Sequence, residues 1–375
     1  MKVFVVFGTR PEAIKMCPLV LELKRQSDLQ CVVCLTGQHR EMLSQVMEAF
    51  QVKEDYNLDI MKEKQSLTTI TTGILEKIEP VLKKEKPNVV LVHGDTTTSY
   101  AAALAAFYQQ IPVGHVEAGL RTGDIYSPFP EEMNRLLTDR ISTFYFAPTE
   151  QNKMNLLTEG ISEEIYVTGN TVIDAFAYTV KQDYIFHEAI LNSIEFDSKR
   201  VVLITAHRRE NWGEPLQNIC NAIKKLSEEY PEALFVYPVH LNPLVRETVF
   251  TRLSNLKNVW LIEPIDVLDM HNLLARCYMV MTDSGGLQEE APHFGKPVLV
   301  LRKETERPEA VEAGTVKVVG VEEPVIHREA RHLMDFKESY ERMARAVNPY
   351  GDGHASERIA EVMLNWHNMK RAELT

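Results

Sequence analysis

The side chains best suited to chemistry in this sequence are three acids and one histidine, each placed at the end of an apolar run or beside a rigid turn. Asp95 and Glu117 follow the segments LVHG and VGHV, and Glu131 follows the turn SPFP. Burial there would raise the pKa of a carboxyl group toward the range useful for proton transfer, whereas exposed acids would only be hydrated. His207, followed by two arginines, can donate to a phosphate or move a proton near neutral pH, although a lone histidine is more often structural. Asp95, Glu117, Glu131 and His207 are therefore the candidates for acid–base catalysis.

The segment 279–292, MVMTDSGGLQEEAP, is a candidate phosphate site. A short apolar run turns through Ser284, Gly285 and Gly286 into a helix, and the glycines let a ligand approach the backbone. The helix start offers free N–H groups and the positive end of its dipole to a phosphate or diphosphate. Glu290 lies about one turn farther and could reach a ribose hydroxyl. A plain strand–turn–helix connection with glycines for packing explains the same residues equally well.

A second candidate anion site lies near the N-terminus, in the segment GTRPEAIK. Pro11 suits the first turn of a helix, where a missing N–H group has no consequence. Arg10 and Lys15 then flank the helix N-terminus. This position favours a role in binding an anionic ligand, and the alternative is that they are two ordinary surface residues.

These residues need a parallel sheet to position them, and the sequence predicts two. Short apolar runs alternate with amphipathic helical segments along the whole chain. The predicted strands are 3–7, 31–35, 89–93, 113–116, 144–147, 165–168, 201–205, 234–238, 259–262, 278–282 and 298–301. The predicted helices of the first half are 12–25, 41–50, 68–84, 98–108, 131–142 and 151–159, and a further helix begins near residue 355. The fold class is therefore α/β, with two doubly wound Rossmann-like halves.

The pattern restarts after a loose patch at 182–198, so we expect an N-terminal domain of residues 1–170 plus 355–375 and a C-terminal domain of residues 171–354. A chain of 375 residues fits two domains better than one. The polar segments fall after the strands, where ligands bind in such sheets. We therefore expect one large site in an interdomain cleft.

Composition excludes several other classes of protein. A formal net charge of −12 argues against general binding to nucleic acid or to an anionic membrane. No apolar run approaches the roughly 20 residues that span a bilayer, and the N-terminus has no small-residue cleavage site, so we expect a cytoplasmic protein. The five cysteines should be buried structural thiols, including the C-x-x-C pair at positions 31 and 34.

Cofactor motifs are missing from the sequence. The histidines show no zinc-binding spacing, no G-x-G-x-x-G follows the first strand, and no G-x-x-x-x-G-K-[ST] occurs. We expect no metal, no nicotinamide and no other cofactor.

The ordered motifs GTRPEAIKM, HGDTTT, HVEAGLRTGD, SPFPEEMNR, TAHRREN, TDSGGLQEEAP and NPYGDGHASERI closely resemble those of the bacterial non-hydrolysing UDP-N-acetylglucosamine 2-epimerases. The likeness extends over essentially the whole chain. It implies the glycosyltransferase-B architecture, a homodimer, and interconversion of UDP-GlcNAc and UDP-ManNAc for cell-envelope polysaccharide synthesis. It further implies anti elimination of UDP through 2-acetamidoglucal, followed by re-addition.

The resemblance also implies roles for single residues. Asp95, Glu117 and Glu131 would handle the proton, with Lys15 and His207 close to the reacting centre. UDP would be bound by Arg10, Lys15, His207, Met270, Ser284, Gly285, Gly286 and Glu290, although relatives often carry an aromatic residue at the uracil-stacking position 270. A second UDP-GlcNAc would act as an allosteric activator at Gln38, Gln65, Glu131, Arg208 and His240.

Three rival functions share this architecture. A hydrolysing epimerase would release UDP and free ManNAc, and the HGDTTT loop disfavours it. A glycosyltransferase would need an acceptor groove or a membrane-facing patch, and the sequence has no basic–aromatic stripe to supply one. A nucleotide-sugar sensor would bind without catalysis, and the three acids argue against it. Fold alone does not choose among these functions.

Overall fold

The computed structural model describes residues 1–37, 40–61 and 65–373, and the chain divides into two compact units. Unit 1 comprises Met1–Tyr178 with Tyr350–Thr375, and unit 2 comprises Thr179–Pro349. The predicted domain limits differ from these by a few residues. Two hydrogen bonds explain the difference, from Asn170 N to Tyr350 O (2.7 Å) and from Ser356 N to Asp174 (2.6 Å). They hold residues 171–178 and 350–354 with unit 1.

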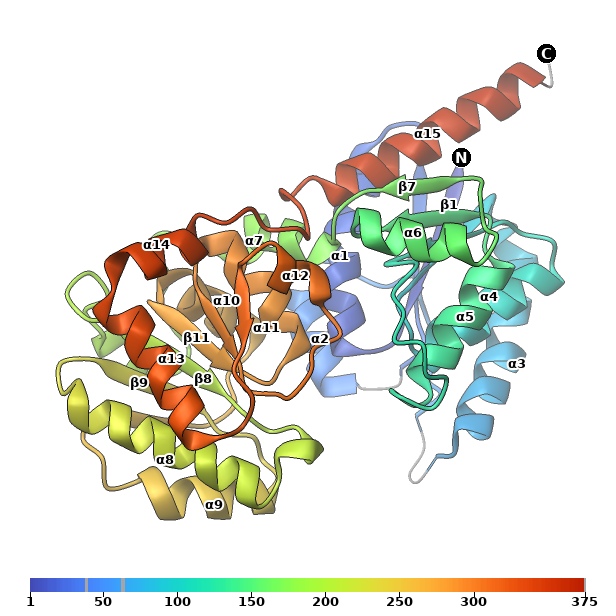
Figure 1. Cartoon of the computed structure of the whole chain (residues 1–375). Coiled ribbons are helices and arrows are strands. Elements are labelled where there is room, and N and C mark those ends of the chain that lie inside the picture. Colours follow the sequence, from blue (N-terminus) through green and yellow to red (C-terminus); the bar gives the residue numbers. More distant parts are fainter. Residues whose placement is uncertain (38–39, 62–64, 374–375) are drawn as a thin grey trace. The chain divides into compact units, whose positions relative to one another are not determined.

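Unit 1 is built on a seven-stranded parallel sheet of order β3-β2-β1-β4-β5-β6-β7 (Figure 1). Its strands are β1 (Lys2–Phe7), β2 (Gln30–Leu35), β3 (Tyr56–Asn57), β4 (Val89–His93), β5 (Val113–Val116), β6 (Phe144–Ala147) and β7 (Ile165–Val167). Its helices are α1 (Arg10–Arg25), α2 (Arg40–Ala49), α3 (Leu67–Glu85), α4 (Thr97–Tyr108), α5 (Glu131–Ile141), α6 (Glu150–Thr158), α7 (Thr171–Thr179) and α15 (Ala355–Glu373). Helices α1, α2 and α15 pack together, and α3, α4 and α5 form a second group.

Unit 2 is built on a six-stranded parallel sheet of order β10-β9-β8-β11-β12-β13 (Figure 1). Its strands are β8 (Val201–Thr205), β9 (Leu234–Pro238), β10 (Val259–Ile262), β11 (Met279–Thr282), β12 (Val298–Val300) and β13 (Val316–Val318). Its α-helices are α8 (Glu214–Glu229), α9 (Pro243–Leu253), α10 (Val267–Arg276), α11 (Gly285–Glu290), α12 (Pro308–Glu312), α13 (Glu323–Asp335) and α14 (Lys337–Ala344), joined by three short 3-10 helices, η1 (Ala189–Ser193), η2 (Arg209–Asn211) and η3 (Ala291–Phe294). Two parallel, doubly wound sheets confirm the predicted fold class.

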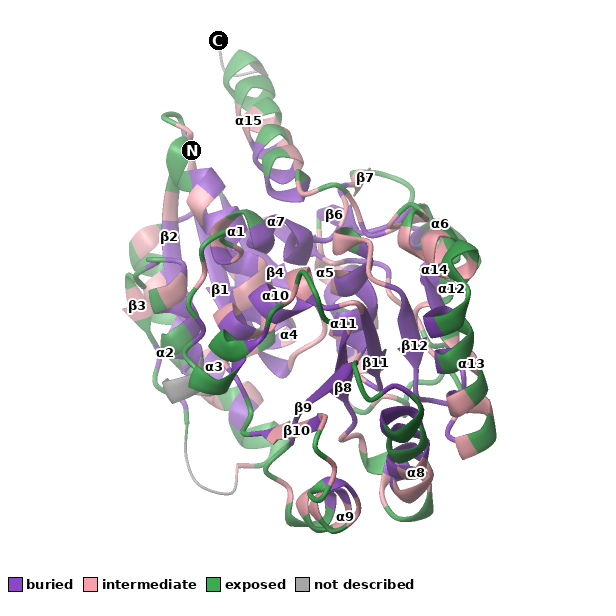
Figure 2. Cartoon of the chain, turned by 90° about the vertical axis from the view of Figure 1, so that its left-hand side faces the viewer, coloured by how far each residue is buried: buried purple, intermediate pink, exposed green. Residues whose placement is uncertain are grey.

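The central strands form these sheets because their residues are apolar on both faces. All five residues of β4 and of β8 are buried, as expected for parallel strands covered by helices on both sides. Figure 2 shows central strands such as β8 and β11 as buried and the outer faces of helices such as α8 and α13 as exposed. Within the described residues, no helix is both long and apolar enough to cross a bilayer.

Two edge strands were not predicted from the sequence. β3 has only two residues and pairs with the end of β2, and β13 has the pattern VKV with an exposed central lysine. Both are shorter than the runs of four to eight residues that give a strand signal. Neither lies among the strands that carry the candidate site.

Candidate functional site

In unit 1, the loops after β1 and β4 are joined by the buried carboxylate of Glu12. It accepts hydrogen bonds from the backbone N–H groups of Gly8 (3.0 Å) and Thr9 (2.7 Å), and from the hydroxyls of Thr96 (2.7 Å) and Ser99 (3.2 Å). Thr9 in turn caps the first turn of α1, so the two residues form a capping box. The start of α1 is therefore fixed to the loop that follows β4.

Glu117 lies directly after β5 and is the most constrained of the predicted acids. Its φ of +69° lies in the left-handed region, which costs a residue with a side chain about 1–3 kcal/mol. Its carboxylate forms a salt bridge with Lys15 and accepts a hydrogen bond from Asn170 Nδ2 (2.9 Å). His93 Nε2 lies 3.6 Å away and makes no hydrogen bond within the described part of the chain. Arg10, the half-buried first residue of α1, lies at the same edge of the sheet.

The pKa of Glu117 is shifted in the direction opposite to the sequence-based expectation. Burial alone would raise it, as predicted. The charge and hydrogen bond of the Lys15 ammonium, together with the nearby His93, outweigh burial and hold the pKa of Glu117 well below its usual range. Glu117 is therefore ionised at neutral pH.

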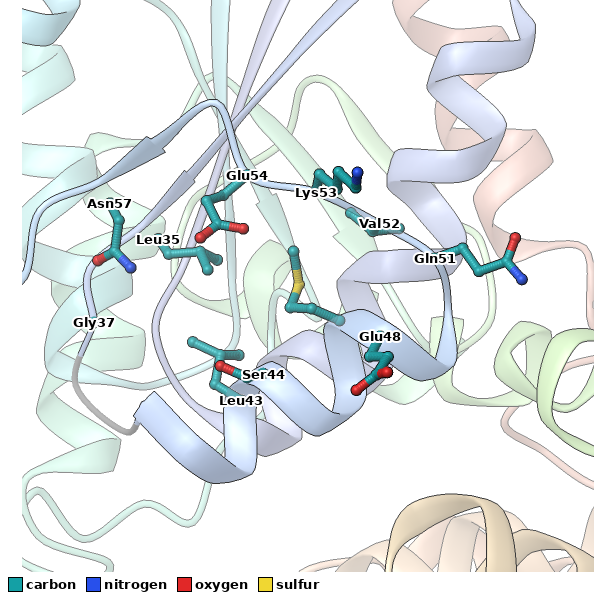
Figure 3. A pocket seen from close by; sticks show the side chains of 11 residues that line it. Leu35, Gly37, Leu43, Ser44, Glu48, Gln51, Val52, Lys53, Glu54 and Asn57 are labelled. Carbon is teal, nitrogen blue, oxygen red and sulfur yellow. The ribbon is translucent and has the colours of Figure 1, made fainter.

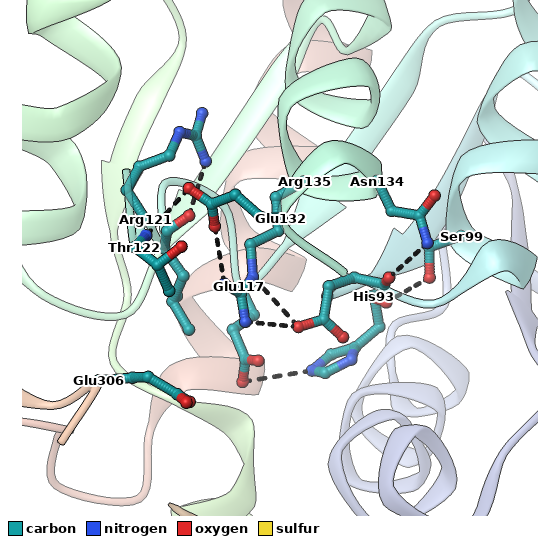
Figure 4. A network of polar contacts seen from close by, with 12 residues as sticks. His93, Ser99, Glu117, Arg121, Thr122, Glu132, Asn134, Arg135 and Glu306 are labelled. Carbon is teal, nitrogen blue, oxygen red and sulfur yellow. Dashed lines mark hydrogen bonds and ion pairs between the residues drawn. The ribbon is translucent and has the colours of Figure 1, made fainter. Parts of the chain in front are cut away.

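Asp95, at the end of β4, is held by a network centred on Arg135 of α5 (Figure 4). Arg135 donates to Asp95 Oδ2 from Nη2 (2.7 Å) and Nε (3.1 Å), and to Glu132 Oε2 from Nη1 (2.9 Å). Asn134 Nδ2 donates to the backbone carbonyl of Asp95 (2.9 Å). The second oxygen of Glu132 accepts from the backbone N–H groups of residues 122–123 at 2.9 and 3.1 Å. One guanidinium thus fixes Asp95 and the loop that follows β5.

The structure brings several residues to this edge that the sequence analysis missed. Glu131 is the half-buried first residue of α5, and the neighbouring acid at 132 is the one that carries the network. Glu132 and Arg135 have the i, i+3 spacing that pairs side chains on a helix, so this ion pair could have been predicted from the sequence. His93 and Asn170 had none, because only the folded sheet brings them to Glu117.

In unit 2, the fully buried carboxylate of Asp283 organises the loop after β8. Its Oδ2 accepts from the backbone N–H groups of His207 and Arg208 (both 2.8 Å) and from Asn211 Nδ2 (2.9 Å). Its Oδ1 makes no hydrogen bond among the described residues and lies 3.6 Å from His207 Nδ1. The Asp283 carboxylate therefore fixes the backbone at His207, one of the predicted site residues.

The imidazole of His207 is stacked on that of His240, with ring centroids 5.1 Å apart and planes 8° from parallel. Burial lowers the pKa of His207, and the positive charge that His240 and Arg208 contribute acts in the same direction. Asp283 opposes this shift without reversing it. A neutral imidazole at pH 7 suits a hydrogen-bond donor to phosphate, and it is ready to take up a proton.

The helix α11 begins earlier than predicted, because Ser284 is its N-cap and Gly285 and Gly286, predicted to form a turn, are its first two residues. A Cβ atom at Gly285 would lie 2.7 Å from Nη1 of Arg307, and one at Gly286 would lie 3.0 Å from Oε1 of Glu290. A side chain at either position would therefore make the end of a neighbouring side chain shift.

Glu290 and Met270, predicted to contact ribose and uracil, lie on α11 and α10 of the same unit. Glu290 Oε2 is 3.7 Å from Nε2 of His271, whose Nδ1 is 2.8 Å from the hydroxyl of Thr179. Met270 is half-buried beside His271 in the sequence. Unit 2 thus holds the predicted UDP-binding residues at positions 207, 270, 284–286 and 290, and unit 1 holds those at positions 10 and 15.

The predicted activator residues are distributed over both units. Gln38 lies outside the described residues. Gln65 donates to a backbone carbonyl of unit 1 (2.6 Å), and Glu131 lies at the start of α5. In unit 2, Arg208 lies 3.9 Å from an acidic side chain and the exposed His240 is stacked on the neighbouring imidazole.

A cavity of about 420 Å³ lies in unit 1 between α2 and the strands β2 and β3 (Figure 3). Its described lining residues include Leu43, Met47 and Val52, with Glu48 and Lys53 at its polar side. None of these described lining residues is a predicted site residue.

One group in unit 2 has the residue types of a metal site, namely His187, Asp266 and Asp269. Asp269 already accepts from the Tyr184 hydroxyl (2.8 Å) and from the backbone N–H groups of His187 (2.9 Å) and Glu188 (2.8 Å). Asp266 caps α10 and pairs with the imidazole at 2.6 Å. Both carboxylates therefore already form hydrogen bonds that stabilise the local fold. A motif search does not find the cluster, because His187 lies far from the two aspartates in the sequence.

Comparison with known proteins places the chain in a family. The model of the UDP-N-acetylglucosamine 2-epimerase family matches residues 21–364. The UDP-N-acetylglucosamine 2-epimerase of Bacillus subtilis (strain 168) is 52% identical over 374 residues, covering 100% of this chain and 97% of the relative. The crystal structure of the Neisseria meningitidis UDP-GlcNAc 2-epimerase bound to UDP-GlcNAc is 53% identical, with a TM-score of 0.89, 97% of this chain and 100% of that chain covered. A co-structure of S. aureus MnaA with UDP is 48% identical, with a TM-score of 0.89 and coverage of 98% and 97%.

The fold itself extends to glycosyltransferases. The calicheamicin glycosyltransferase CalG4 is only 15% identical but has a TM-score of 0.61 over 97% of both chains. Two parallel, doubly wound sheets with polar strand ends therefore define a protein of the glycosyltransferase-B class. Within that class, the chain belongs to the UDP-N-acetylglucosamine 2-epimerase family.

Proposed function

We propose that this protein catalyses the reversible C2 epimerisation of UDP-GlcNAc and UDP-ManNAc without hydrolysis. UDP leaves by anti elimination, 2-acetamidoglucal stays bound, and UDP returns with the proton on the opposite face of C2. In this proposal unit 1 handles the proton and unit 2 holds UDP. No metal or other cofactor takes part.

The observation that carries the proposal is the ionised, buried carboxylate of Glu117 beside Lys15. A carboxylate of low pKa is too weak a base to remove an ordinary C2 hydrogen, and each 1.4 kcal/mol of missing stabilisation costs about tenfold in rate. Departure of UDP changes this, because the resulting positive charge at C1 acidifies the C2 hydrogen. Glu117 is suited to that order of events: it stabilises the developing positive charge and then accepts the proton.

The departing diphosphate needs donors that favour its added charge. The neutral imidazole of His207, whose pKa burial lowers, can donate its ring N–H to the diphosphate as negative charge builds there. The backbone at Ser284–Gly286 supplies N–H groups, and Arg10 adds a cation. Glu290 binds the ribose hydroxyls, and Met270 lies against uracil.

Asp95 and Glu131 complete the proposed proton-handling set. Asp95 is clamped by Arg135, which fixes the direction of its carboxylate next to the loop after β5. The assignment of donor and acceptor for each direction of the reaction stays open among Asp95, Glu117 and Glu131.

We further propose that UDP-GlcNAc activates the enzyme at a second site formed by Gln38, Gln65, Glu131, Arg208 and His240. Pure UDP-ManNAc is then a poor starting substrate until some UDP-GlcNAc is present. A lag that disappears on addition of UDP-GlcNAc is the expected result. Immediate turnover of pure UDP-ManNAc, unchanged by added UDP-GlcNAc, would contradict activation. A homodimer, a cytoplasmic location and a role in cell-envelope polysaccharide synthesis belong to the same proposal.

Chromatography of the products tests the reaction and separates it from hydrolysis. Incubation of UDP-GlcNAc with purified protein should give UDP-ManNAc and no accumulating free ManNAc. Glu117→Gln, which keeps the size of the side chain, should lower kcat by at least about 100-fold, in the range that acid–base groups contribute. Glu79→Gln, at an exposed acid of α3, is the matched control and should leave kcat unchanged. Release of UDP and free ManNAc in equal amounts would instead establish the hydrolysing reaction.

A further inference from the structure

The re-entry segment, residues 350–353, is the part of the chain that returns from unit 2 to unit 1. No step of the proposed reaction uses it. A Cβ atom at Gly351 would lie 3.1 Å from the α-carbon of Gly169, so the two backbones touch without a side chain between them. Next to this contact, Asn170 N donates to the carbonyl of Tyr350 (2.7 Å). The re-entry segment therefore fixes the backbone of Asn170 within unit 1.

The side chain of Asn170 is buried, and both ends of its amide form hydrogen bonds. Its Oδ1 accepts from the N–H of Val172 (3.1 Å), as the N-cap of a helix does, at the start of α7. This contact turns the NH2 group of the amide toward Glu117, and Nδ2 donates to the carboxylate oxygen Oε2 (2.9 Å). The amide therefore joins the first turn of α7 to the acid that follows β5.

The partners of Glu117 all face the same one of its two oxygens. Lys15 Nζ and Asn170 Nδ2 both bind Oε2, and His93 Nε2 lies 3.6 Å from that atom. In the part of the chain that the structure describes, no group donates a hydrogen bond to Oε1. A Cβ atom at Gly94 would lie 3.6 Å from Oε1, and the glycine keeps this space free of a side chain. Oε1 is therefore the oxygen whose lone pairs are available to a proton.

We propose that Asn170 is a positioning residue that, together with Lys15, holds Oε2 of Glu117 so that Oε1 exchanges the C2 proton of the substrate. When the proton is removed, the C2–H bond breaks and an Oε1–H bond forms. The C–H electron pair enters the double bond between C1 and C2, and UDP leaves with the electron pair of the C1–O bond. The catalytic part of this inference rests on the proposed epimerisation, whereas the orientation of the carboxylate does not.

Two substitutions separate the hydrogen bond to Glu117 from the cap of α7. Asn170→Asp keeps an oxygen for the N–H of Val172 but has no donor for Oε2. Asn170→Ser keeps a capping hydroxyl, which ends one bond short of the position of Nδ2. Both should stay folded with KM nearly unchanged, and kcat should fall about tenfold in Asn170→Ser and about 100-fold in Asn170→Asp. Asn88→Asp, at an exposed asparagine whose Oδ1 accepts from the first N–H of β1 (2.7 Å), is the matched control with wild-type kcat.

The pH profile of kcat distinguishes positioning of the carboxylate from a general effect on the fold. Burial raises the pKa of Glu117, and Lys15 and His93, the titratable groups that face it, lower the pKa by more. A carboxylate at position 170 adds a like charge and disfavours the ionised form of Glu117. Asn170→Asp should therefore move the acidic limb of the profile to higher pH, and Asn170→Ser, which adds no charge, should move it much less.

The contribution of the re-entry segment is tested by two alanine substitutions at glycines of positive φ. Gly351 and Gly353 have φ values of +117° and +90°, so a side chain is strained at either position. Only the Cβ atom at Gly351 would press on Gly169, because the nearest atoms to a Cβ at Gly353 are 4.0 Å away. Gly351→Ala should lower kcat about tenfold, whereas Gly353→Ala should keep the wild-type kcat at a similar cost in stability.

Carbon-13 NMR of glutamate-labelled protein without substrate gives a result that is independent of activity. The signal of Glu117 is the one missing from Glu117→Gln, and it should titrate at higher pH in Asn170→Asp than in the wild type. An unchanged titration, or wild-type kcat in both variants at position 170, would overturn the positioning role. Equal kcat values for Gly351→Ala and Gly353→Ala would overturn the part of the re-entry segment. Should Asn170→Ser not fold, the kcat and the acidic limb of Asn170→Asp decide. An inactive wild-type protein would refute the proposed function and leave the NMR result standing.

Discussion

Replacement of Lys15 by methionine should reverse the pH dependence of stability that Glu117 contributes to unit 1. The side chains of this pair are only 13% and 9% exposed, so it belongs with buried ion pairs and not with surface ones. Removal of one partner of a buried pair costs about 3–5 kcal/mol, because the other charge stays buried without compensation. We therefore expect Lys15→Met to lower the free energy of unfolding of unit 1 by about 3–5 kcal/mol at neutral pH.

The sign of the pH dependence follows from the pKa of Glu117. In the wild-type protein this pKa is held below its unfolded value of about 4.3, so the stabilisation is present above that pH and is lost as the pH falls through the folded pKa. In Lys15→Met, burial acts with less opposition and raises the pKa. The contribution of Glu117 is then present below about pH 4.3 and is lost as the pH rises through the new pKa. The difference between the two proteins should thus be largest near neutrality and should shrink toward about pH 4.

Urea denaturation measured by tryptophan fluorescence can follow unit 1 alone. Trp366 of α15 packs edge-to-face on Phe144, with ring centroids 5.3 Å apart, and the two other tryptophans, Trp212 and Trp260, belong to unit 2. Replacement of those two by phenylalanine leaves Trp366 as the reporter.

Lys83→Met is the matched control for this measurement. Its pair with Glu79 is about half exposed, so the substitution should cost at most about 0.5 kcal/mol at any pH. A loss below about 1 kcal/mol for Lys15→Met at neutral pH, or a loss that is the same at about pH 4, would refute the assignment of a low pKa to the Glu117 carboxylate.

Three further predictions concern unit 2 and the thiols. Asp283→Asn should weaken UDP binding about tenfold by calorimetry, because the carboxylate that holds the His207 and Arg208 N–H groups loses its charge, a change worth roughly 1–3 kcal/mol; unchanged affinity would contradict this. Gly285→Ala should weaken UDP binding and lower the melting temperature, since its Cβ would lie 2.7 Å from Nη1 of Arg307; a variant with wild-type affinity and stability would show that the guanidinium moves freely. The five cysteines should react with an aromatic disulfide reagent only after unfolding, because burial raises each thiol pKa; fast reaction of the native protein would show an exposed thiolate.

The sequence predicted the sheets well because the central strands are continuous apolar runs. Val89–His93 and Val201–Thr205 match the prediction residue for residue, since parallel strands covered on both faces give the strongest pattern. The short edge strands β3 and β13 escaped, because two or three residues cannot show a period. The sequence also predicted that polar segments follow the strands, because the end of each apolar run can be located in the sequence.

The partners of the site residues could not be predicted in the same way. Glu117 was expected to have a raised pKa, and only the fold shows Lys15, His93 and Asn170 around it. Those partners come from α1, β4 and the loop before α7, segments that no local pattern relates to one another. Burial of a carboxylate can be inferred from its position after a strand, but the sign of its pKa shift depends on which charges the topology brings to it.

Proton NMR of UDP-GlcNAc with the purified protein in D2O follows both the configuration and the isotope at C2 and so tests the proposed epimerisation itself. Elimination and return of UDP should give a mixture of UDP-GlcNAc and UDP-ManNAc, deuterium at C2 of both sugars, and no free ManNAc. An unchanged C2 signal with no deuterium uptake would contradict proton removal altogether, and accumulation of free ManNAc with UDP would contradict the return of UDP to the bound glucal.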